Sequence, residues 1–274
     1  MIQDISPSRL DNAYSDKKPQ EGDRFFVFDR DGRVLIGNDM DRIVFPAITD
    51  ISDEKTIYLF SIDEKRYFLS HDEPIQKREG FGYYSIREVR DRFPDDSKVE
   101  IYAVFTAYHL WRWYADNRYC GRCSGELVHG SKERSLICPD CGNTVYPRIN
   151  PAVIVGVTNG DRILLTRYRQ GYGHNALVAG FTEIGETLEE TVKREVMEET
   201  GLKVKNIRYY KSQPWGMAQD ILVGYYCDVD GSDEIHMDEN ELKYAEWVKR
   251  EEIILQPNNL SLTNEMMKVF KESS

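Results

Sequence analysis

The sequence lacks any long hydrophobic run, and no apolar stretch approaches the roughly 20 residues that a membrane-spanning helix needs. Its first residues, MIQDISPSRLDNAY, are polar and partly acidic, and they do not form the apolar core of a signal peptide. Internal repeats and low-complexity tracts are missing as well. We therefore expect a globular, cytoplasmic protein with no membrane partner.

Positive charge is also in short supply. The chain has 36 Lys and Arg residues against 47 Asp and Glu residues, which gives a net charge of −11. Such a surface repels the phosphate backbone of long nucleic acids and argues against broad duplex binding. A small phosphate-bearing molecule is not excluded, because bound divalent cations invert the local field.

The length of 274 residues suits two domains. The first part of the chain alternates apolar and polar residues, and the segments RFFVFD, RVLIG, TIYLFSID and KRYFLS are predicted strands. The segment SIREVRDRF predicts a short helix. Residues 99–119, with apolar positions at helical spacing and no Gly or Pro, predict a longer connecting helix.

The last part of the chain alternates predicted strands with one strong helix over residues 188–200, which suggests an α/β or α+β domain. A terminal helix is predicted for LTNEMMKVFKESS. The predicted strands are PAVIVGVTN, RILLTRYR, ALVAGFTE, KNIRYYKSQPW, DILVGYYCDV and YAEWVKREEI.

Four of the five cysteines form two C-x2-C pairs, Cys120–Cys123 and Cys138–Cys141, with fourteen residues between the pairs. Two such knuckles place four thiolates around one structural Zn²⁺ per chain, and a closed four-ligand site argues against catalytic zinc. A redox pair or plain buried cysteines are the alternatives. Cys227 is left over and is expected to pack as a small hydrophobe.

The predicted helix over residues 188–200 begins with a Thr-x-x-Glu capping box at Thr187 and ends at Gly201. It carries the clustered carboxylates Glu195, Glu198 and Glu199 beside its apolar stripe. Carboxylates crowded at the edge of a core repel one another unless a cation is present, and Mg²⁺ or Mn²⁺ prefers such oxygen ligands. A solvated acidic helix is the alternative.

The wider pattern around this helix favours the metal site. It reads G-x5-E-x7-R-E-U-x-E-E-x-G-U, where U is aliphatic. The matching residues are Gly180, Glu186, Arg194, Glu195, Val196, Glu198, Glu199, Gly201 and Leu202. This is the Nudix box, and the protein resembles the Nudix hydrolases. The resemblance implies an α/β/α sandwich and a divalent-metal-dependent attack of water on a diphosphate linked to a nucleoside.

Metal ligands follow from the same resemblance. It implies that Glu195 and Glu199 bind Mg²⁺ or Mn²⁺ with Glu198 close by, and that Arg194 orients the glutamates by pairing with Glu186. These five residues are the expected catalytic set. The resemblance adds the backbone carbonyl of Ala179 and the distal carboxylate of Glu241 as metal ligands, although Glu241 also fits a solvated acidic turn.

A Nudix box preceded by a cysteine ribbon and an extra domain is similar to the NADH pyrophosphatase branch of the family. The implied domains are a mainly β N-terminal domain with its connecting helix over residues 1–115, a zinc ribbon over 116–147 and a Nudix domain over 148–274. The resemblance also suggests a homodimer, for which the aromatic segment FTAYHLWRWY offers interface area.

Substrate contacts are implied by a further signature of this branch, S-Q-P-W-P-F-P-x-S. The chain matches its first half and then departs from it, because the stiff Pro-Phe-Pro turn is replaced by a flexible segment and an acid. The corresponding segment of this chain consists of Ser212, Gln213, Pro214, Trp215, Gly216, Met217, Ala218, Gln219 and Asp220, of which the first four match. We expect the stretch from Gln213 to Asp220 to bind substrate.

Three further positions carry substrate expectations. The family stacks a ring on the residue after the box glycine, here Phe181, and has a ligand-contacting tyrosine after the ribbon, here Tyr146. A core or packing role is the alternative for both. Thr263 lies where a substrate-contacting alanine is expected.

The resemblance implies hydrolysis of NADH or NAD⁺ to nicotinamide mononucleotide and AMP. Removal of an NAD cap from the 5′ end of RNA uses the same chemistry. The altered substrate segment keeps another nucleoside diphosphate derivative, such as ADP-ribose, as an alternative. A non-catalytic nucleotide-sensing module is the alternative from another class, and the intact box argues against it.

Overall fold

The computed structural model describes residues 1–51, 56–70, 79–93, 97–169 and 173–273. The chain folds into two compact units. The C-terminal unit contains Ile149–Trp215 and the chain from Asp220 onward, together with Met1–Ile2. The N-terminal unit contains Gln3–Arg148 and the short segment Gly216–Gln219. Each unit is described by itself.

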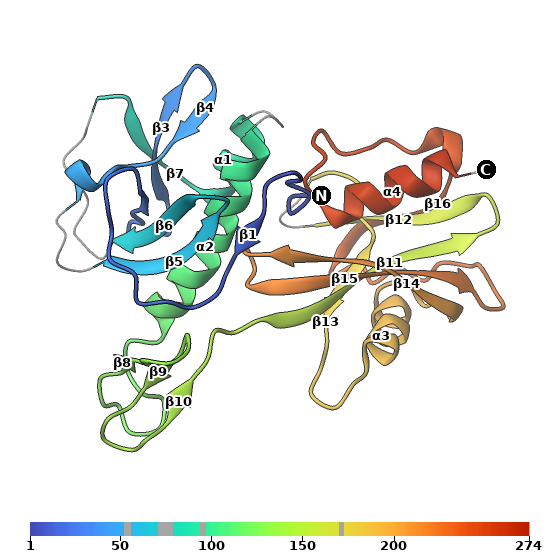
Figure 1. Cartoon of the computed structure of the whole chain (residues 1–274). Helices are drawn as coiled ribbons and strands as arrows, with labels where there is room; N and C mark the ends of the chain where they lie inside the picture. Colours follow the sequence, from blue (N-terminus) through green and yellow to red (C-terminus); the bar gives the residue numbers. More distant parts are fainter. Residues whose placement is uncertain (52–55, 71–78, 94–96, 170–172, 274) are drawn as a thin grey trace. The chain divides into compact units, whose positions relative to one another are not determined.

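A mixed six-stranded sheet forms the centre of the C-terminal unit, with the strand order β14-β15-β11-β12-β16 and with β13 paired to β11 (Figure 1). Strands β11 and β15 run parallel, and the other pairs are antiparallel. The strands are β11 (Asn150–Asn159), β12 (Arg162–Tyr168), β13 (Val178–Phe181), β14 (Val204–Trp215), β15 (Asp220–Val229) and β16 (Leu242–Lys249). A 3₁₀ turn, η4 (Arg250–Glu252), follows β16 and ends the strand earlier than the sequence pattern predicts.

Helix α3 (Leu188–Thr200) has the bounds that the sequence predicts. The Thr187 side chain accepts a hydrogen bond from the backbone of Glu190, and the Glu190 carboxylate accepts one from the backbone of Thr187. This reciprocal capping box satisfies two free backbone donors at the start of the helix. Gly201 ends the helix at φ 70°, a left-handed conformation that favours glycine.

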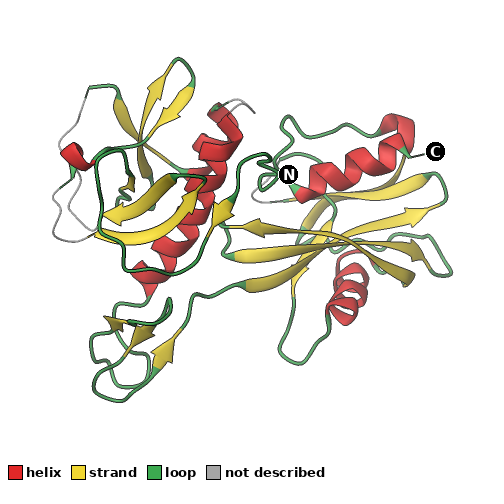
Figure 2. Ribbon diagram, in the orientation of Figure 1, coloured by secondary structure: helices red, strands yellow, loops and turns green. Residues whose placement is uncertain are grey.

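The two faces of the sheet are covered by different helices, as Figures 1 and 2 show. On one face, Val192 and Val196 of α3 pack with Val153, Val155 and Leu164 of the sheet. On the other face, α4 (Leu262–Glu272) packs with Ile154, Ile163 and Leu165, and Met1 is buried in the same cluster. A sheet between two helical layers is the α/β/α sandwich that the resemblance implies, and this prediction of fold class is confirmed.

The N-terminal unit is mainly β. A four-stranded sheet has the order β1-β5-β6-β2, and a three-stranded sheet has the order β4-β3-β7. The strands are β1 (Leu10–Asp11), β2 (Arg24–Phe26), β3 (Val34–Asp39), β4 (Arg42–Val44), β5 (Thr56–Ile62), β6 (Lys65–Ser70) and β7 (Phe81–Tyr84), and a 3₁₀ turn η1 (Ile48–Asp50) follows β4. The sequence pattern identifies β2, β3, β5 and β6, while β1, β4 and β7 are too short or too irregular to stand out.

Two helices complete this unit, α1 (Ile86–Arg92) and α2 (Lys98–Asp116). The aromatic residues of α2 are used inside the unit. Trp113 is 1% exposed, and Tyr108 and Trp111 pack their rings against Phe28. These rings therefore have partners inside the unit, and a role of the segment in a dimer interface stays a prediction.

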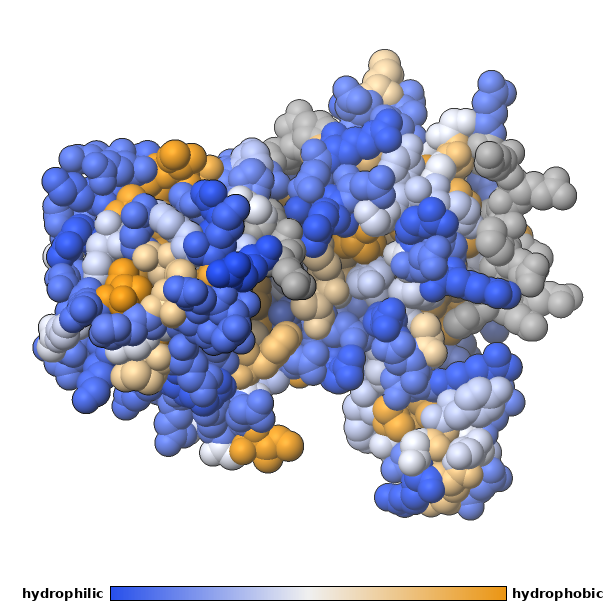
Figure 3. Space-filling view, turned by 180° about the vertical axis from the view of Figure 1, so that it is seen from behind, coloured by the Kyte–Doolittle hydropathy of each residue, from blue (hydrophilic) through white to orange (hydrophobic). Residues whose placement is uncertain are grey.

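A small three-stranded sheet follows α2, with the order β10-β9-β8. Its strands are β8 (Val128–His129), β9 (Leu136–Ile137) and β10 (Thr144–Val145). On the face shown in Figure 3, hydrophilic surface dominates and hydrophobic side chains form only small patches. Within the described parts of the chain, no helix combines the length and the apolar character that crossing a membrane requires.

Candidate active site

Strand β13 and helix α3 place two residues of the box, Gly180 and Glu195, directly against each other. A Cβ added to Gly180 on β13 would come within 1.9 Å of the Glu195 carboxylate carbon and within 2.0 Å of its nearer oxygen. The Glu195 carboxylate therefore fills the space that any other side chain at position 180 would occupy. The box glycine is a steric requirement for the position of this carboxylate.

Arg194 connects the loop before α3 with the carboxylates on the helix. Its Nε and Nη2 donate to the two carboxylate oxygens of Glu186 at 2.6 and 2.9 Å. Its Nη1 donates to Glu195 at 2.8 Å and to Glu198 at 3.1 Å, and Nη2 also donates to the backbone carbonyl of Phe181 at 2.9 Å. One planar guanidinium thus fixes the positions of three carboxylates and of one backbone carbonyl at the end of β13.

The charge on Glu186 follows from this pairing. The hydrogen bonds from Arg194 lower the pKa of Glu186 to about 2, and the backbone N–H of Glu183 and the hydroxyl of Thr191 add to the effect. Glu186 is therefore ionised throughout the physiological range. It holds Arg194 in place, as the resemblance implies.

Glu199 lies in a different environment from its neighbours, because it is only 2% exposed. The Tyr168 hydroxyl lies 3.1 and 3.4 Å from the two Glu199 carboxylate oxygens. Burial raises the pKa of Glu199 to about 8, and the negative charges of Glu195 and Glu241 add to the shift. Burial also raises the pKa of Glu195, against the opposing effect of Arg194.

This charge distribution fits a divalent cation. The donor set consists of carboxylates and one backbone carbonyl, which are the hard oxygen ligands that Mg²⁺ and Mn²⁺ prefer. A carboxylate with a pKa near 8 is a carboxylate whose negative charge is costly in the protein alone, and a nearby cation offsets that cost. Glu241, which lies just before β16, contributes to the field at both Glu195 and Glu199.

The four cysteines of the ribbon lie in the N-terminal unit and form one cluster. Their sulfur atoms all lie within 4.8 Å of one another. The Cys120–Cys141 and Cys123–Cys138 sulfur distances are 3.7 and 3.4 Å. Zn–S bonds of about 2.3 Å in a tetrahedron place the sulfurs about 3.8 Å apart, so the cluster fits a structural zinc ion.

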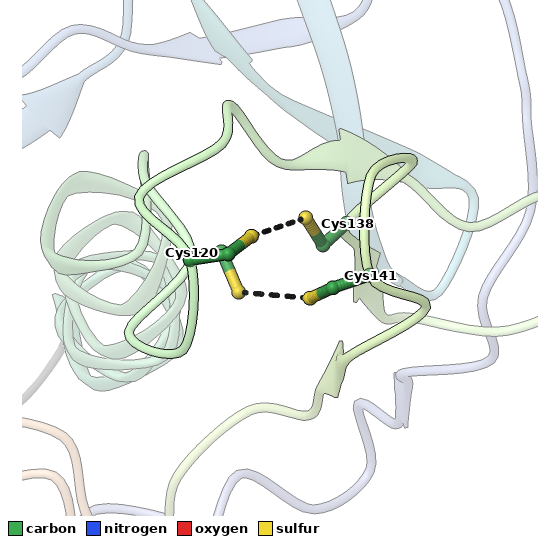
Figure 4. A group of neighbouring side chains, drawn as sticks. Cys120, Cys138 and Cys141 are labelled. Atoms are coloured by element: carbon green, nitrogen blue, oxygen red, sulfur yellow. Dashed lines mark hydrogen bonds between the residues drawn. The ribbon is translucent and has the colours of Figure 1, made fainter.

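Figure 4 shows Cys120 on one loop facing Cys138 and Cys141 on a second loop. Backbone N–H donors also reach this cluster, because the amide of Arg122 donates to the Cys120 sulfur at 3.4 Å. Within the described residues, this is the one group of three or more His, Cys, Asp or Glu side chains with all ligand atoms inside 4.8 Å. The carboxylates around Arg194 are therefore held further apart than the thiols.

The residues of the predicted substrate segment differ in burial and in the contacts that they make. Gln213 on β14 is fully buried, and its side-chain amide binds the backbone carbonyl of Leu260 and the backbone N–H of Leu262. It ties β14 to the start of α4. Pro214 is exposed and Trp215 is half-buried at the end of the same strand.

Gly216–Gln219 packs within the N-terminal unit. A Cβ on Gly216 would lie 2.0 Å from the backbone oxygen of Phe105, so this position excludes any residue with a side chain, and its glycine is a packing requirement. The Gln219 side chain is 6% exposed and accepts a hydrogen bond from Arg148. The expectation of a loose segment is wrong at Gly216. Met217 is half-buried, and Ala218 is exposed.

Asp220 begins β15 and is 5% exposed. Its Oδ1 has no hydrogen-bond partner among the described residues, and burial raises its pKa to about 7. It pairs with Asn150 on β11 and Trp215 on β14 in the sheet. The acid in this segment is thus a buried group at a strand end.

The remaining substrate expectations lie at separate places. Phe181 is 51% exposed at the end of β13, next to the carboxylate cluster, so it is not a core residue. Tyr146 is 56% exposed in the N-terminal unit, and its hydroxyl donates to Glu133 at 2.8 Å. Thr263 is half-buried in the first turn of α4.

Comparison with known families matches two adjacent segments of the chain. Residues 148–270 match the NUDIX domain family, and residues 115–146 match the NADH pyrophosphatase zinc ribbon domain. Fold, box and match together define residues 148–270 as a NUDIX domain. The chain carries this domain directly behind a zinc ribbon of the NADH pyrophosphatase type.

Similar proteins carry a specific name. The chain is 42% identical over 151 residues to proteins called NAD-capped RNA hydrolase NudC from Escherichia coli O1:K1 / APEC and from Shigella dysenteriae serotype 1 (strain Sd197). The match covers 54% of this chain and 58% of each relative. A NUDIX hydrolase structure from Nitrosomonas europaea is similar with a TM-score of 0.49 and 22% identity, covering 57% of this chain and 90% of that one.

Sequence reasoning missed Tyr168 as a member of the site. The hydroxyl of this residue contacts both Glu199 and the backbone of Ala179. A signal exists in RILLTRYR, because residues 164, 166 and 168 alternate onto one face of the strand and Leu164 packs on α3. Tyr168 therefore falls on the face of the sheet that α3 covers.

Proposed function

We propose that this protein hydrolyses the diphosphate of NADH and NAD⁺ to nicotinamide mononucleotide and AMP, using Mg²⁺ or Mn²⁺. The observation that carries the proposal is the pairing of Arg194 on α3 with Glu195 on the same helix and with Glu186 in the loop before it, in a NUDIX domain behind an NADH pyrophosphatase zinc ribbon. The relatives called NAD-capped RNA hydrolase NudC add NAD-capped RNA 5′ ends as a second substrate with the same bond to cleave.

Each group of the site has a role in this proposal. Glu195, Glu199, Glu241 and the Ala179 carbonyl hold the cations. Divalent cations neutralise the charge on a diphosphate and make water a stronger nucleophile. Arg194 keeps Glu195 and Glu198 in fixed positions, and Glu186 keeps Arg194 in place.

The reaction breaks one P–O bond of the diphosphate. The oxygen of water adds to one phosphorus, its proton passes to a carboxylate of the cluster, and the other phosphate leaves with its nucleoside. Phe181, exposed at the end of β13, offers a ring on which the nicotinamide or adenine stacks.

The resemblance implies further substrate contacts on the segment from Pro214 to Asp220 and at Tyr146 and Thr263, and these stay predictions. Gln213 supports them from inside the fold through its bonds to the backbone before α4. A homodimer and a cytoplasmic location complete the proposal. The five cysteines, all free in the structure, suit a reducing compartment.

A second candidate substrate is ADP-ribose or another nucleoside diphosphate derivative. The observation that favours it is the departure at Gly216–Asp220, where a tightly packed glycine and a buried acid replace the family's Pro-Phe-Pro-x-Ser. A non-catalytic sensor is disfavoured because every carboxylate of the box is present.

A substrate panel tests the proposal. NADH, NAD⁺, ADP-ribose and NAD-capped RNA are incubated with the full chain and Mn²⁺, and the products are separated by chromatography and weighed by mass spectrometry. The proposal predicts nicotinamide mononucleotide and AMP from the dinucleotides. Exclusive turnover of ADP-ribose would move the function to the second candidate, and light scattering reads the oligomeric state of the same preparation.

A further inference from the structure

Tyr168 is a side chain that the metal-binding proposal does not use, although its hydroxyl lies among the proposed ligands. The hydroxyl oxygen is 3.1 Å from one Glu199 carboxylate oxygen and 3.4 Å from the other. It lies 3.2 Å from the backbone nitrogen of Ala179 and 3.4 Å from the carbonyl oxygen of the same residue. One phenol therefore contacts both a carboxylate on α3 and the backbone of β13.

The fold explains why Tyr168 reaches this point. It is the last residue of β12, where the pairing with β16 shifts by a bulge and Tyr168 comes opposite Leu242. Alternation along the strand places it on the face of the sheet where Leu164 packs against α3. A bulge at a strand end commonly redirects a side chain toward a site.

The direction of these hydrogen bonds follows when Glu199 is ionised, which is the form in which it would bind a cation. A phenol hydroxyl donates one proton, and the Glu199 carboxylate at 3.1 Å is its nearest acceptor. The hydroxyl oxygen in turn accepts the backbone N–H of Ala179.

We propose that Tyr168 is a positioning residue for the divalent cation, because it links the Glu199 carboxylate on α3 to the Ala179 backbone on β13 through one hydroxyl. This inference rests on the proposed function, because it takes the Glu199 carboxylate and the Ala179 carbonyl as ligands. Tyr168 does not touch the cation. It acts through Glu199, in the way that outer hydrogen-bond partners orient the ligands of metal sites.

The test is Mn²⁺ affinity in the absence of substrate, measured on the full, zinc-loaded chain by electron paramagnetic resonance of free Mn²⁺. Tyr168→Phe removes only the hydroxyl and keeps the ring. We expect Mn²⁺ to bind about tenfold or more weakly. The Mn²⁺ concentration for half-maximal activity should rise by the same factor, while the KM for NADH at saturating Mn²⁺ should stay within about twofold of wild type.

Tyr226→Phe is the matched control. Tyr226 lies on β15 of the same unit, is partly buried, and donates its hydroxyl to the backbone of Met266 on α4. Its loss removes a hydrogen bond without touching the carboxylate cluster. Mn²⁺ affinity should stay at the wild-type value, and an equal weakening in both variants would show a general effect of losing a tyrosine hydroxyl and overturn the inference.

A double-mutant cycle separates this inference from the proposed function. Glu199→Gln alone should weaken Mn²⁺ binding, and adding Tyr168→Phe to it should change the affinity by less than about twofold, because the path through Glu199 is already broken. If Glu199→Gln binds Mn²⁺ like wild type, the proposed metal site fails. If Glu199→Gln weakens Mn²⁺ binding but Tyr168→Phe does not, only the positioning role fails. The same holds if the losses of Mn²⁺ affinity from the two substitutions add in full in the double variant.

Discussion

Gly180 makes its contribution by what it lacks. The Glu195 carboxylate occupies the position of the missing Cβ, so Gly180→Ala must displace this flexible side-chain end while leaving the backbone in place. We predict that kcat falls about tenfold or more and that the melting temperature changes little, because the displaced group is a proposed cation ligand.

Gly173→Ala is the control for this substitution, because a Cβ there meets nothing within 4 Å. Steady-state kinetics and thermal unfolding of both variants check the prediction. Wild-type kcat in Gly180→Ala would show that the position of Glu195 is not needed for turnover.

Glu199 is the second residue for which we predict the effect of a substitution, and here both the kcat and the melting temperature should change in a defined direction. Glu199→Gln keeps the size of the side chain and removes a buried negative charge, so kcat should fall at least about a hundredfold if the ligand acts in the transition state. Without added Mg²⁺ or Mn²⁺, the variant should unfold at a slightly higher temperature than wild type, because burial raises the pKa of Glu199 and makes its charge costly. Near-normal turnover would contradict the assignment of Glu199 as a ligand.

Much of the site was predictable from single residues, because the Nudix box has its charged, turn and capping residues at fixed spacings along the chain. Glu186, Arg194 and Glu195 meet where the pattern places them. Tyr168 and the buried side chain of Gln213 were not predictable in their roles, because their partners lie on strands and loops distant in sequence. A spacing rule along one segment carries no information on such contacts.

At the scale of elements, the start of β15 holds a buried carboxyl, Asp220, whose ionisation destabilises the folded state. Asp220 has a pKa of about 7 in the folded chain against a usual value of 3.8, so the folded state holds its proton more tightly than the unfolded state does. The stability that this proton gives is fully present below about pH 4 and is lost as the pH rises through about 7.

Asp220→Asn removes this pH dependence. Relative to wild type, the variant should gain about 2 to 3 kcal/mol more stability at pH 8 than at pH 5. Denaturant unfolding at the two pH values, without added Mg²⁺ or Mn²⁺, gives the comparison. An equal difference between variant and wild type at both pH values would contradict a buried, proton-binding Asp220.

The ribbon gives an element-scale prediction of its own. The sulfur cluster fits one zinc ion, and the short strands β8, β9 and β10 have little other core to hold them. Cys138→Ser should therefore lower the melting temperature and the zinc content, because metal binding and folding are coupled in such ribbons. Elemental analysis of protein purified without chelator should find one zinc per wild-type chain, and well under one zinc would refute the site.

The strands and helices with strong patterns were predicted well, and helix α3 matches its expected bounds because its cap residues are local signals. The short strands β1, β4 and β7 were missed, since their pairing is set by tertiary contacts. The same limit explains Gly216, which the sequence places in a flexible segment but which packs against the backbone of Phe105 on α2.

For the whole molecule, the central claim is metal-dependent cleavage of a nicotinamide dinucleotide at its diphosphate. The most direct measurement is product analysis after the zinc-loaded chain has been incubated with NADH and Mn²⁺, with Glu199→Gln measured in parallel. The account predicts reduced nicotinamide mononucleotide and AMP in equal amounts from wild type, and at least about a hundredfold less from the variant. A level of product from NADH no higher than that of Glu199→Gln would contradict it.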